Sequence, residues 1–109
     1  RPSNAVAKYL MGKGYRIIPV NPGQKDILGQ KCYPTLLDIP GEIKVDIVDV
    51  FRNSEDTPPI AKDAVKIGAK CLWLQLGITN EEAKRIATEA GLDFVENKCT
   101  KIEHSKYLV

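Results

Sequence analysis

Apolar residues recur along this chain with two spacings, the helical one of about 3.6 residues and the strand one of two. Three times a stretch with helical spacing is followed by a glycine and then by a short apolar run. This order of amphipathic helix, glycine and buried strand is typical of parallel β-α-β units. The pattern therefore predicts an α/β fold with a mainly parallel sheet.

The first of these units lies at the start of the chain. Its predicted helix has apolar residues on one face, namely Val6, Ala7, Leu10 and Met11. Ser3 or Asn4 is a suitable cap for the start of this helix, and Gly14 follows its end. Residues 15–20 then alternate as a strand that leads into the turn Val20-Asn21-Pro22.

The second unit starts at Thr57, which we expect to cap a helix with Pro58 at its first position. Gly68 ends that helix, and residues 70–76 form the next predicted strand. One more strand is expected at residues 45–51, after a short turn or helix around residues 35–38.

In the third unit Thr79 and Glu82 have the spacing of a capping box. The helix that follows has a small apolar stripe and ends at Gly91, which leads into a strand at residues 92–95. The three units together favour a doubly wound sheet with helices on both faces.

The first helix raises a question of topology. A right-handed parallel crossover needs a strand on both sides of its helix, and no strand precedes this one. We therefore expect a strand and a strand-to-helix loop upstream of Arg1. On this interpretation residues 1–109 are a single Rossmann-like domain that is incomplete at its N-terminus.

Composition narrows the functional classes. The 16 basic and 14 acidic residues give a net charge of +2 with no long run of Lys or Arg, which argues against binding to nucleic acid. No apolar run has the length of a membrane span, so no membrane partner is expected. The three cysteines are far apart, a pattern that favours a reducing cytoplasm over a disulfide framework. His104 has no partner at ligand spacing, and no metal site is predicted.

Polar and aromatic residues follow the predicted strands, where an open α/β sheet binds its ligands. Phe51 offers a flat face to a base, and Arg52 and Lys25 offer positive charge to phosphates. The N-terminus of the first helix offers N–H groups to an anion. The set suits a nucleotide that carries phosphates. The alternative is that these are ordinary loop residues, with Phe51 and Trp73 in the core.

Two polar residues interrupt the apolar strands. Asp49 lies within the strand at residues 45–51, on the opposite sheet face from Asp46, so the pair does not make a catalytic dyad. A bond from Asp49 to a neighbouring loop is the interpretation we adopt. Gln75, near the end of a buried strand, also needs a hydrogen-bonding partner.

Four blocks of sequence carry a family resemblance. They are residues 15–23 with the Val-Asn-Pro turn, Gly29 with residues 32–40, residues 68–83, and residues 90–104. In this order and spacing they resemble the CoA-binding domain family, small Rossmann-like proteins similar to the N-terminal domain of the succinyl-CoA synthetase α subunit. The resemblance implies a domain that binds coenzyme A or an acyl-CoA at the carboxyl ends of its strands.

The resemblance also implies which residues contact the CoA, and they are Ser3, Asn4, Val20, Asn21, Pro22, Lys25, Phe51, Arg52, Gln75 and Gly77. Lys25 departs from the synthetase-like pattern, which has a lysine where this chain has Gln24. The phosphorylated histidine of the synthetase belongs to a second domain, and His104 does not take its role. Ligase activity of this chain alone is therefore not expected.

Several functions remain open at this point. The leading hypothesis is a stand-alone CoA-binding module without catalysis of its own. An NAD(P)-binding Rossmann domain is the alternative, although Asn21 stands near the place where NAD sites have an acidic residue. A thiol-active enzyme that uses Cys99 is another, and so is a regulatory domain that binds CoA as a switch. A homo-oligomer or a protein partner also stays open.

Overall fold

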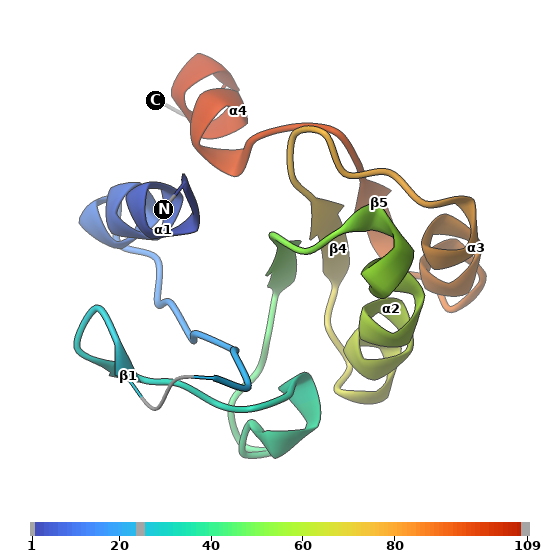
Figure 1. Cartoon of the computed structure of the whole chain (residues 1–109), viewed down its shortest axis with the longest axis horizontal. Coiled ribbons are helices and arrows are strands. Elements are labelled where there is room, and N and C mark those ends of the chain that lie inside the picture. Colours follow the sequence, from blue (N-terminus) through green and yellow to red (C-terminus); the bar gives the residue numbers. More distant parts are fainter. Residues whose placement is uncertain (1, 24–25, 108–109) are drawn as a thin grey trace.

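The structure is a computed structural model that describes residues 2–23 and 26–107 (Figure 1). Its helices and strands follow the chain in the order α1 (Pro2–Gly12), β1 (Asp26–Ile27), β2 (Gln30–Lys31), the 3-10 turn η1 (Leu36–Asp38), β3 (Ile47–Val50), the 3-10 turn η2 (Ser54–Asp56), α2 (Thr57–Lys66), β4 (Cys71–Leu74), α3 (Glu81–Glu89), β5 (Asp93–Val95) and α4 (Thr100–Tyr107). None of the described helices is long and apolar enough to cross a membrane.

The main sheet has the order β3-β4-β5, and both strand pairs are parallel. In its register Asp49 lies beside Trp73, and Trp73 lies beside Val95. The predicted strands at residues 45–51, 70–76 and 92–95 and their parallel arrangement are confirmed. Because the strands are parallel, the loops that follow them meet at one edge of the sheet.

The core lies between this sheet and the helix pair α2 and α3. Alternate residues of β3 and β4 point toward the helices and are buried, namely Val48, Val50, Leu72 and Leu74. The facing helix positions are completely buried alanines, namely Ala61, Ala64, Ala83 and Ala87. Small side chains let the two helices lie close to the sheet and to each other. The helices α1 and α4 lie on the other side of the sheet (Figure 1).

Helix ends in this half of the chain follow the predicted order of helix, glycine and strand. Gly68 and Gly91 have φ angles of +75° and +87°, a conformation that ends α2 and α3 before β4 and β5. The predicted capping residues are wrong. Asn80 caps α3, because its Oδ1 accepts a hydrogen bond from the Ala83 N–H at 2.9 Å. Thr57 Oγ1 instead donates to the Ser54 carbonyl.

The predicted strand at residues 15–20 is not a regular strand. Only Val20 forms a bridge, with Tyr33, through bonds from the Asn21 N–H to the Tyr33 carbonyl and from the Tyr33 N–H to the Pro19 carbonyl. The cause is the lack of a neighbour, since a strand needs a ladder partner and Pro19 has no N–H to donate. Among the described residues, no segment other than the one around Tyr33 pairs with residues 15–20.

One prediction for the first helix needs correction, and one helix of the structure was not predicted. The helix α1 already begins at Pro2, so Ser3 and Asn4 lie in its first turn and do not precede it. The sequence pattern also did not predict α4, a short and polar helix that begins at Thr100. The reason is that α4 takes its position from contacts with distant residues of the sheet, described below.

Candidate ligand-binding cleft

A cleft of about 1680 Å³ separates the N-terminal segment from the three-stranded sheet. Apolar residues of α1 and of residues 15–22 line one side of it, and β3 with the residues after it lines the other. Trp73 and Val95 contribute from the next strands, and Glu103 and His104 from α4. The cleft therefore lies at the boundary between the two halves of the molecule.

The outer edge of β3 faces this cleft. Cys71 N–H donates to the Asp46 carbonyl at 2.9 Å, and Gln75 N–H donates to the Val50 carbonyl at 3.2 Å. Because hydrogen bonds of a parallel ladder alternate along the strand, the backbone groups of Ile47 and Asp49 point away from β4. In the part of the chain that the structure describes, no other strand pairs with this edge.

Five of the predicted site residues line the cleft: Val20, Asn21, Pro22, Phe51 and Arg52. They come from two segments that are about thirty positions apart in the printed sequence. The structure thus brings together the Val-Asn-Pro turn and the residues that follow β3. From the sequence, the two were expected to meet only because both follow predicted parallel strands. This arrangement is the geometric basis of the candidate site.

The turn at Asn21 is held by local hydrogen bonds. Asn21 Oδ1 accepts from the Gly23 N–H at 2.8 Å, and the Asn21 N–H donates to the Tyr33 carbonyl at 2.8 Å. The buried Cys32 Sγ donates weakly to the Asn21 carbonyl at 3.6 Å. These bonds fix the backbone of the turn before any ligand arrives, so little ordering would accompany binding.

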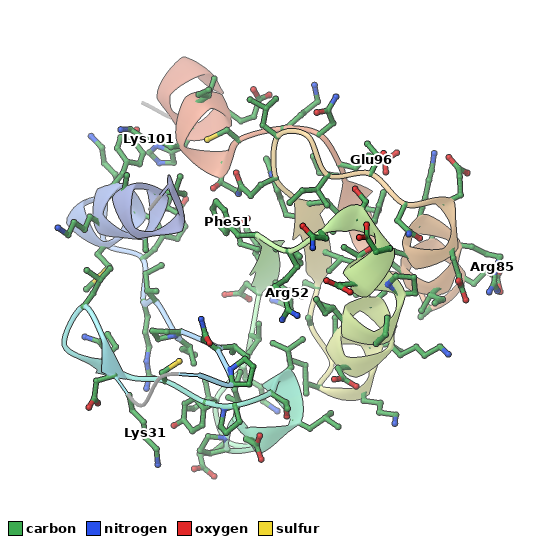
Figure 2. The ribbon with its side chains drawn as sticks, viewed as in Figure 1. Lys31, Phe51, Arg52, Arg85, Glu96 and Lys101 are labelled. Carbon is green, nitrogen blue, oxygen red and sulfur yellow. The ribbon has the colours of Figure 1, made fainter. Side chains whose placement is uncertain are left out.

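Phe51 and Arg52 follow β3 directly and lie next to each other (Figure 2). The Arg52 side chain is 54% exposed, and its only ion pair among the described residues is a long one of 4.0 Å to Asp56. Such an exposed pair is weak, so the guanidinium is free to bind an anionic ligand at little cost. Phe51 is half-buried and offers part of its ring to the cleft.

The other predicted site residues lie in different surroundings. Gln75 is 3% exposed and Gly77 N–H donates to Asn97 Oδ1 at 2.7 Å, so both are engaged within the protein. Neither is part of the cleft lining. The backbone of Ser3 and Asn4 belongs to α1, and Lys25 lies outside the described residues. Contacts from these five residues to a ligand stay predictions.

Asp49 has the polar surroundings that its place in a buried strand requires. Its Oδ1 accepts from Gln75 Nε2, and its Oδ2 accepts from Thr100 Oγ1 at 2.9 Å. Gln75 also bonds Thr100, donating to its Oγ1 at 2.9 Å and accepting from its N–H at 3.3 Å. Burial raises the pKa of Asp49, and the bonds from Gln75 and Thr100 oppose that rise. The predicted bond from Asp49 to a neighbouring loop is confirmed by Gln75, which follows β4, whereas the second partner, Thr100, is the first residue of α4.

Asparagine and serine side chains connect the loops at the carboxyl edge of the sheet. Ser54 accepts from the Thr79 N–H at its Oγ and from Asn80 Nδ2 at its carbonyl. Asn97 has a φ of 58° and bonds both the Gly77 N–H and the Ile78 carbonyl. The sequence did not predict the bonds that Ser54, Asn80 and Asn97 make, although an asparagine close after a strand is a common sign of a left-handed turn.

The aromatic residues after and within the strands change one expectation. Phe51 and Trp73 are not in the core as the alternative predicted, because both are half-buried and line the cleft. The Trp73 indole N–H donates to the Lys98 carbonyl at 2.7 Å. Cys99 is half-buried. The pKa of a different thiol, Cys71, is raised by burial and by the nearby carboxylates Asp93 and Asp49. Within the described ranges, no cluster of His, Cys, Asp and Glu could hold a metal ion.

Comparison with known proteins places these features in a family. The sequence model of a family described as the CoA binding domain matches residues 1–105. The uncharacterised protein YneT of Bacillus subtilis is 40% identical over 105 residues, which cover 96% of this chain and 76% of that protein.

Solved structures give the same result. A hypothetical protein from Pyrococcus horikoshii is 44% identical with a TM-score of 0.93, over 97% of this chain and 73% of that one. A dinucleotide forming acetyl-coenzyme A synthetase from Ca. Korarchaeum cryptofilum is 26% identical with a TM-score of 0.73, over 84% of this chain and 22% of that one. The fold is therefore shared by small proteins and by one part of a larger synthetase.

Proposed function

This chain belongs to the CoA-binding domain family, and we propose on that premise that it binds coenzyme A or an acyl-CoA as a binding or regulatory module. The observation that carries the proposal is the meeting of the Val20-Asn21-Pro22 turn with Phe51 and Arg52 in one cleft. Three chemical features of CoA need partners, namely its base, its phosphates and its pantetheine arm. The two segments supply groups suited to each of them.

Arg52 is the proposed phosphate contact. Its guanidinium is exposed and only weakly paired with Asp56, and a guanidinium binds phosphate oxygens through two donors at once. Phe51 is the proposed contact for the adenine or the pantetheine arm, through its half-buried ring. Ser3 and Asn4 in the first turn of α1 are proposed as further phosphate contacts, because N–H groups at a helix N-terminus bind anions.

The turn at residues 20–22 is proposed to contact the ligand through its backbone. Val20 is 37% exposed at the cleft, and its N–H and carbonyl are not the groups that bond Tyr33. Asn21 supplies no acidic oxygen for a ribose hydroxyl, which favours CoA over NAD at this position. Lys25, which follows the turn, is proposed as a second cation for the phosphates.

Isothermal titration with CoA, dephospho-CoA and NAD tests this function. We expect a measurable heat with CoA, weaker binding of dephospho-CoA because one phosphate is missing, and no binding of NAD. The absence of heat with both CoA species at high micromolar concentration would overturn the proposal. Binding of NAD in preference to CoA would support the alternative of a dinucleotide-binding domain.

A titration with acetyl-CoA in the same series addresses the thiol-active alternative. If Cys99 exchanged an acyl group with CoA, acetyl-CoA would leave a mass increase on the protein that the Cys99→Ala variant lacks. We expect reversible binding of acetyl-CoA and an unchanged protein mass.

A further inference from the structure

The helix α4 lies beside α1, and the chain reaches it from the end of β5 in the three-stranded sheet (Figure 1). It is the element against which α1 mainly packs. Two residues of α4 make separate polar contacts: Thr100, at its first position, bonds the sheet, and His104, one turn later, bonds α1. The helix thus connects two parts of the protein that the cleft separates.

The contact with the sheet is a closed set of hydrogen bonds. Thr100 donates from Oγ1 to Asp49 and from its N–H to Gln75, and it accepts from Gln75 Nε2. Gln75 in turn donates to Asp49. Thr100 and Gln75 are 7% and 3% exposed, so water does not replace these bonds easily. An acidic group beside the first turn of α4 also suits the helix dipole.

The contact with α1 is aromatic and polar. The Tyr9 hydroxyl and His104 Nδ1 share a hydrogen bond of 2.9 Å, and their rings meet edge to face at 5.5 Å. Tyr15, just after α1, packs edge to face on the same imidazole at 5.8 Å. The ammonium groups of Lys13 and Lys101 each lie 5.6 Å from the centre of the Tyr9 ring. These contacts hold α1 to α4 at one wall of the cleft.

We propose that α4 is a strap that sets the position of α1 relative to the sheet, with Asp49, Gln75 and Thr100 as positioning residues at its start and Tyr9 and His104 as positioning residues one turn later. The strap tunes ligand affinity from a distance, and this part of the proposal rests on the proposed CoA function, because α1 carries the predicted phosphate contacts Ser3 and Asn4. The positioning of α1 by α4 does not depend on a bound ligand.

If α4 positions α1, a change in the contact between α4 and the sheet must affect α1. If α4 only packs beside α1, no such effect is expected. Asp49 and Tyr9 contact different residues of α4, and changes at sites that share no partner normally act independently. If α4 sets the position of α1, removing a hydrogen bond between Thr100 and the sheet must also make α1 less stable. Hydrogen exchange of the α1 amides reports that loosening in the free protein.

The first experiment compares Thr100→Val with Thr100→Ser. Valine keeps the shape and removes the hydroxyl, whereas serine keeps the hydroxyl that bonds Asp49 and Gln75. We expect α1 amides to exchange about fivefold faster in the valine variant, the effect of one net hydrogen bond, and nearly as in the parent protein in the serine variant. Unchanged α1 exchange in Thr100→Val, with faster exchange confined to α4, would overturn the strap.

The second experiment compares Tyr9→Phe with Tyr15→Phe at the contact between α4 and the N-terminal segment. Only Tyr9 bonds His104 through its hydroxyl, so Tyr15→Phe retains its ring contact and serves as the matched control. We expect faster exchange of α1 in Tyr9→Phe alone. Equal exchange in the two variants would contradict the role of the Tyr9–His104 bond.

Titration with CoA then separates this inference from the proposed function. We expect Thr100→Val and Tyr9→Phe to weaken CoA binding about threefold to tenfold, because each variant loosens α1. Neither residue is among the proposed CoA contacts, so such a loss would be indirect. If the parent protein does not bind CoA, the proposed function fails, while the exchange result still decides the strap. If α1 loosens and CoA affinity is unchanged, the strap does not control the ligand site.

Discussion

The two sides of the cleft use similar sequence patterns and reach different structures. On one side, helix, glycine and apolar run become α2 with β4 and α3 with β5, packed around a core of buried leucines, valines and alanines. On the other, α1 and Gly14 are followed by residues 15–20, which form only a single bridge at Val20. The same local pattern becomes a strand only where a neighbour supplies the ladder.

The difference also explains where the candidate site lies. The sheet side supplies rigid supports, such as the loops joined by Ser54, Asn80 and Asn97. The N-terminal side supplies a turn with polar backbone groups and a helix held mainly by α4. The two sides make few contacts with each other across the cleft. A ligand that contacts both sides would connect them.

The largest expected effect concerns the core on the sheet side. Leu72 is fully buried, and Leu72→Ala should lower the free energy of unfolding by about 3 kcal/mol through lost burial and a cavity. Leu10 in α1 is half-buried at the cleft, and Leu10→Ala should cost about 1 kcal/mol. Urea denaturation measures both. Equal losses would show that the two sides are equally well packed.

The next effect concerns ligand binding at Arg52. Removing its guanidinium in Arg52→Ala should weaken CoA binding about tenfold, the value of one charge-assisted hydrogen bond, with little change in stability. Titration calorimetry of the variant measures this loss.

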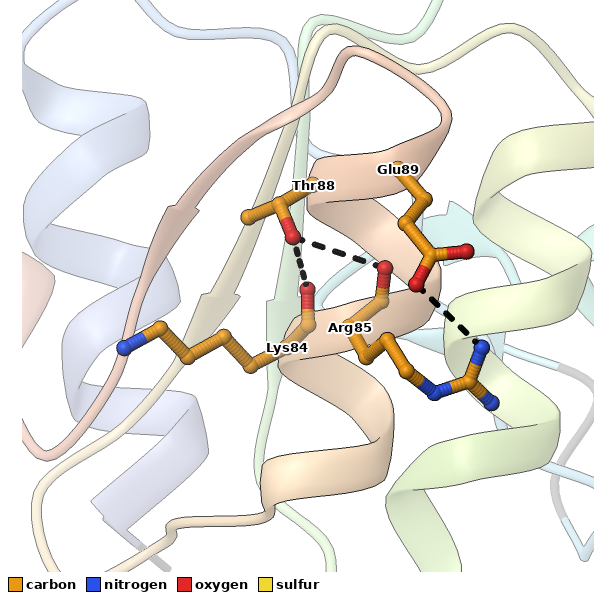
Figure 3. A network of polar contacts seen from close by, with 4 residues as sticks. All are labelled: Lys84, Arg85, Thr88 and Glu89. Carbon is orange, nitrogen blue, oxygen red and sulfur yellow. Dashed lines mark hydrogen bonds and ion pairs between the residues drawn. The ribbon is translucent and has the colours of Figure 1, made fainter.

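Arg85 is the matched control for that experiment. It is 58% exposed on α3 and pairs with Glu89 at 3.4 Å, beside the Thr88 hydroxyl that bonds the Lys84 carbonyl (Figure 3). It points away from the cleft (Figure 2). Arg85→Ala should leave CoA affinity unchanged, and an equal loss in both variants would mean that Arg52 acts only through general charge.

A smaller effect compares two asparagines that each bond a glycine N–H. Asn97 bonds Gly77 at 2.7 Å and has a φ of 58°, so Asn97→Ala should cost about 1 kcal/mol from the strained backbone and the lost bond. Asn21 bonds Gly23 in an exposed contact, and Asn21→Ala should cost about 0.5 kcal/mol. Thermal unfolding measures both. Asn97→Gly, which relieves the backbone strain, should recover part of the loss.

The smallest effect is a pH dependence at Asp49. Its pKa is raised by burial in the folded state, so the folded protein binds this proton more tightly than the unfolded chain does. Its contribution to stability is complete below the ordinary carboxyl pKa and is lost as pH rises through the raised value. The stability difference between the parent protein and Asp49→Asn should therefore shift against the parent as pH increases across the acidic range. Urea titrations at several pH values measure it, and a shift in the other direction would contradict the burial of Asp49.

The sequence predicted the parts of the fold that local patterns determine. Gly68 and Gly91 mark helix ends through their own φ angles, and the strands at either side are apolar enough to be recognised. The sequence did not predict α4, because its start depends on Thr100 bonding Asp49 of β3 and Gln75, which follows β4. Long-range hydrogen bonds of this kind leave no periodic signal.

The candidate site was predictable to a similar degree. Asn21, after the bridge at Val20, and Arg52, after β3, were recognisable from sequence as candidate residues, and both line the cleft. Gln75 has the same position, but the fold uses its amide inside the protein. The chemistry of a side chain alone does not decide between these outcomes, because burial and partners come from the tertiary structure.

Hydrogen exchange of the full chain with and without saturating CoA tests the proposed site most directly. We expect slower exchange in two separate places, the amides around residues 20–23 and those around residues 51–54, because the ligand contacts both sides of the cleft. Arg52→Ala should reduce the protection in both places. Protection on one side alone, or only in segments away from the cleft, would contradict a CoA site that joins the two regions.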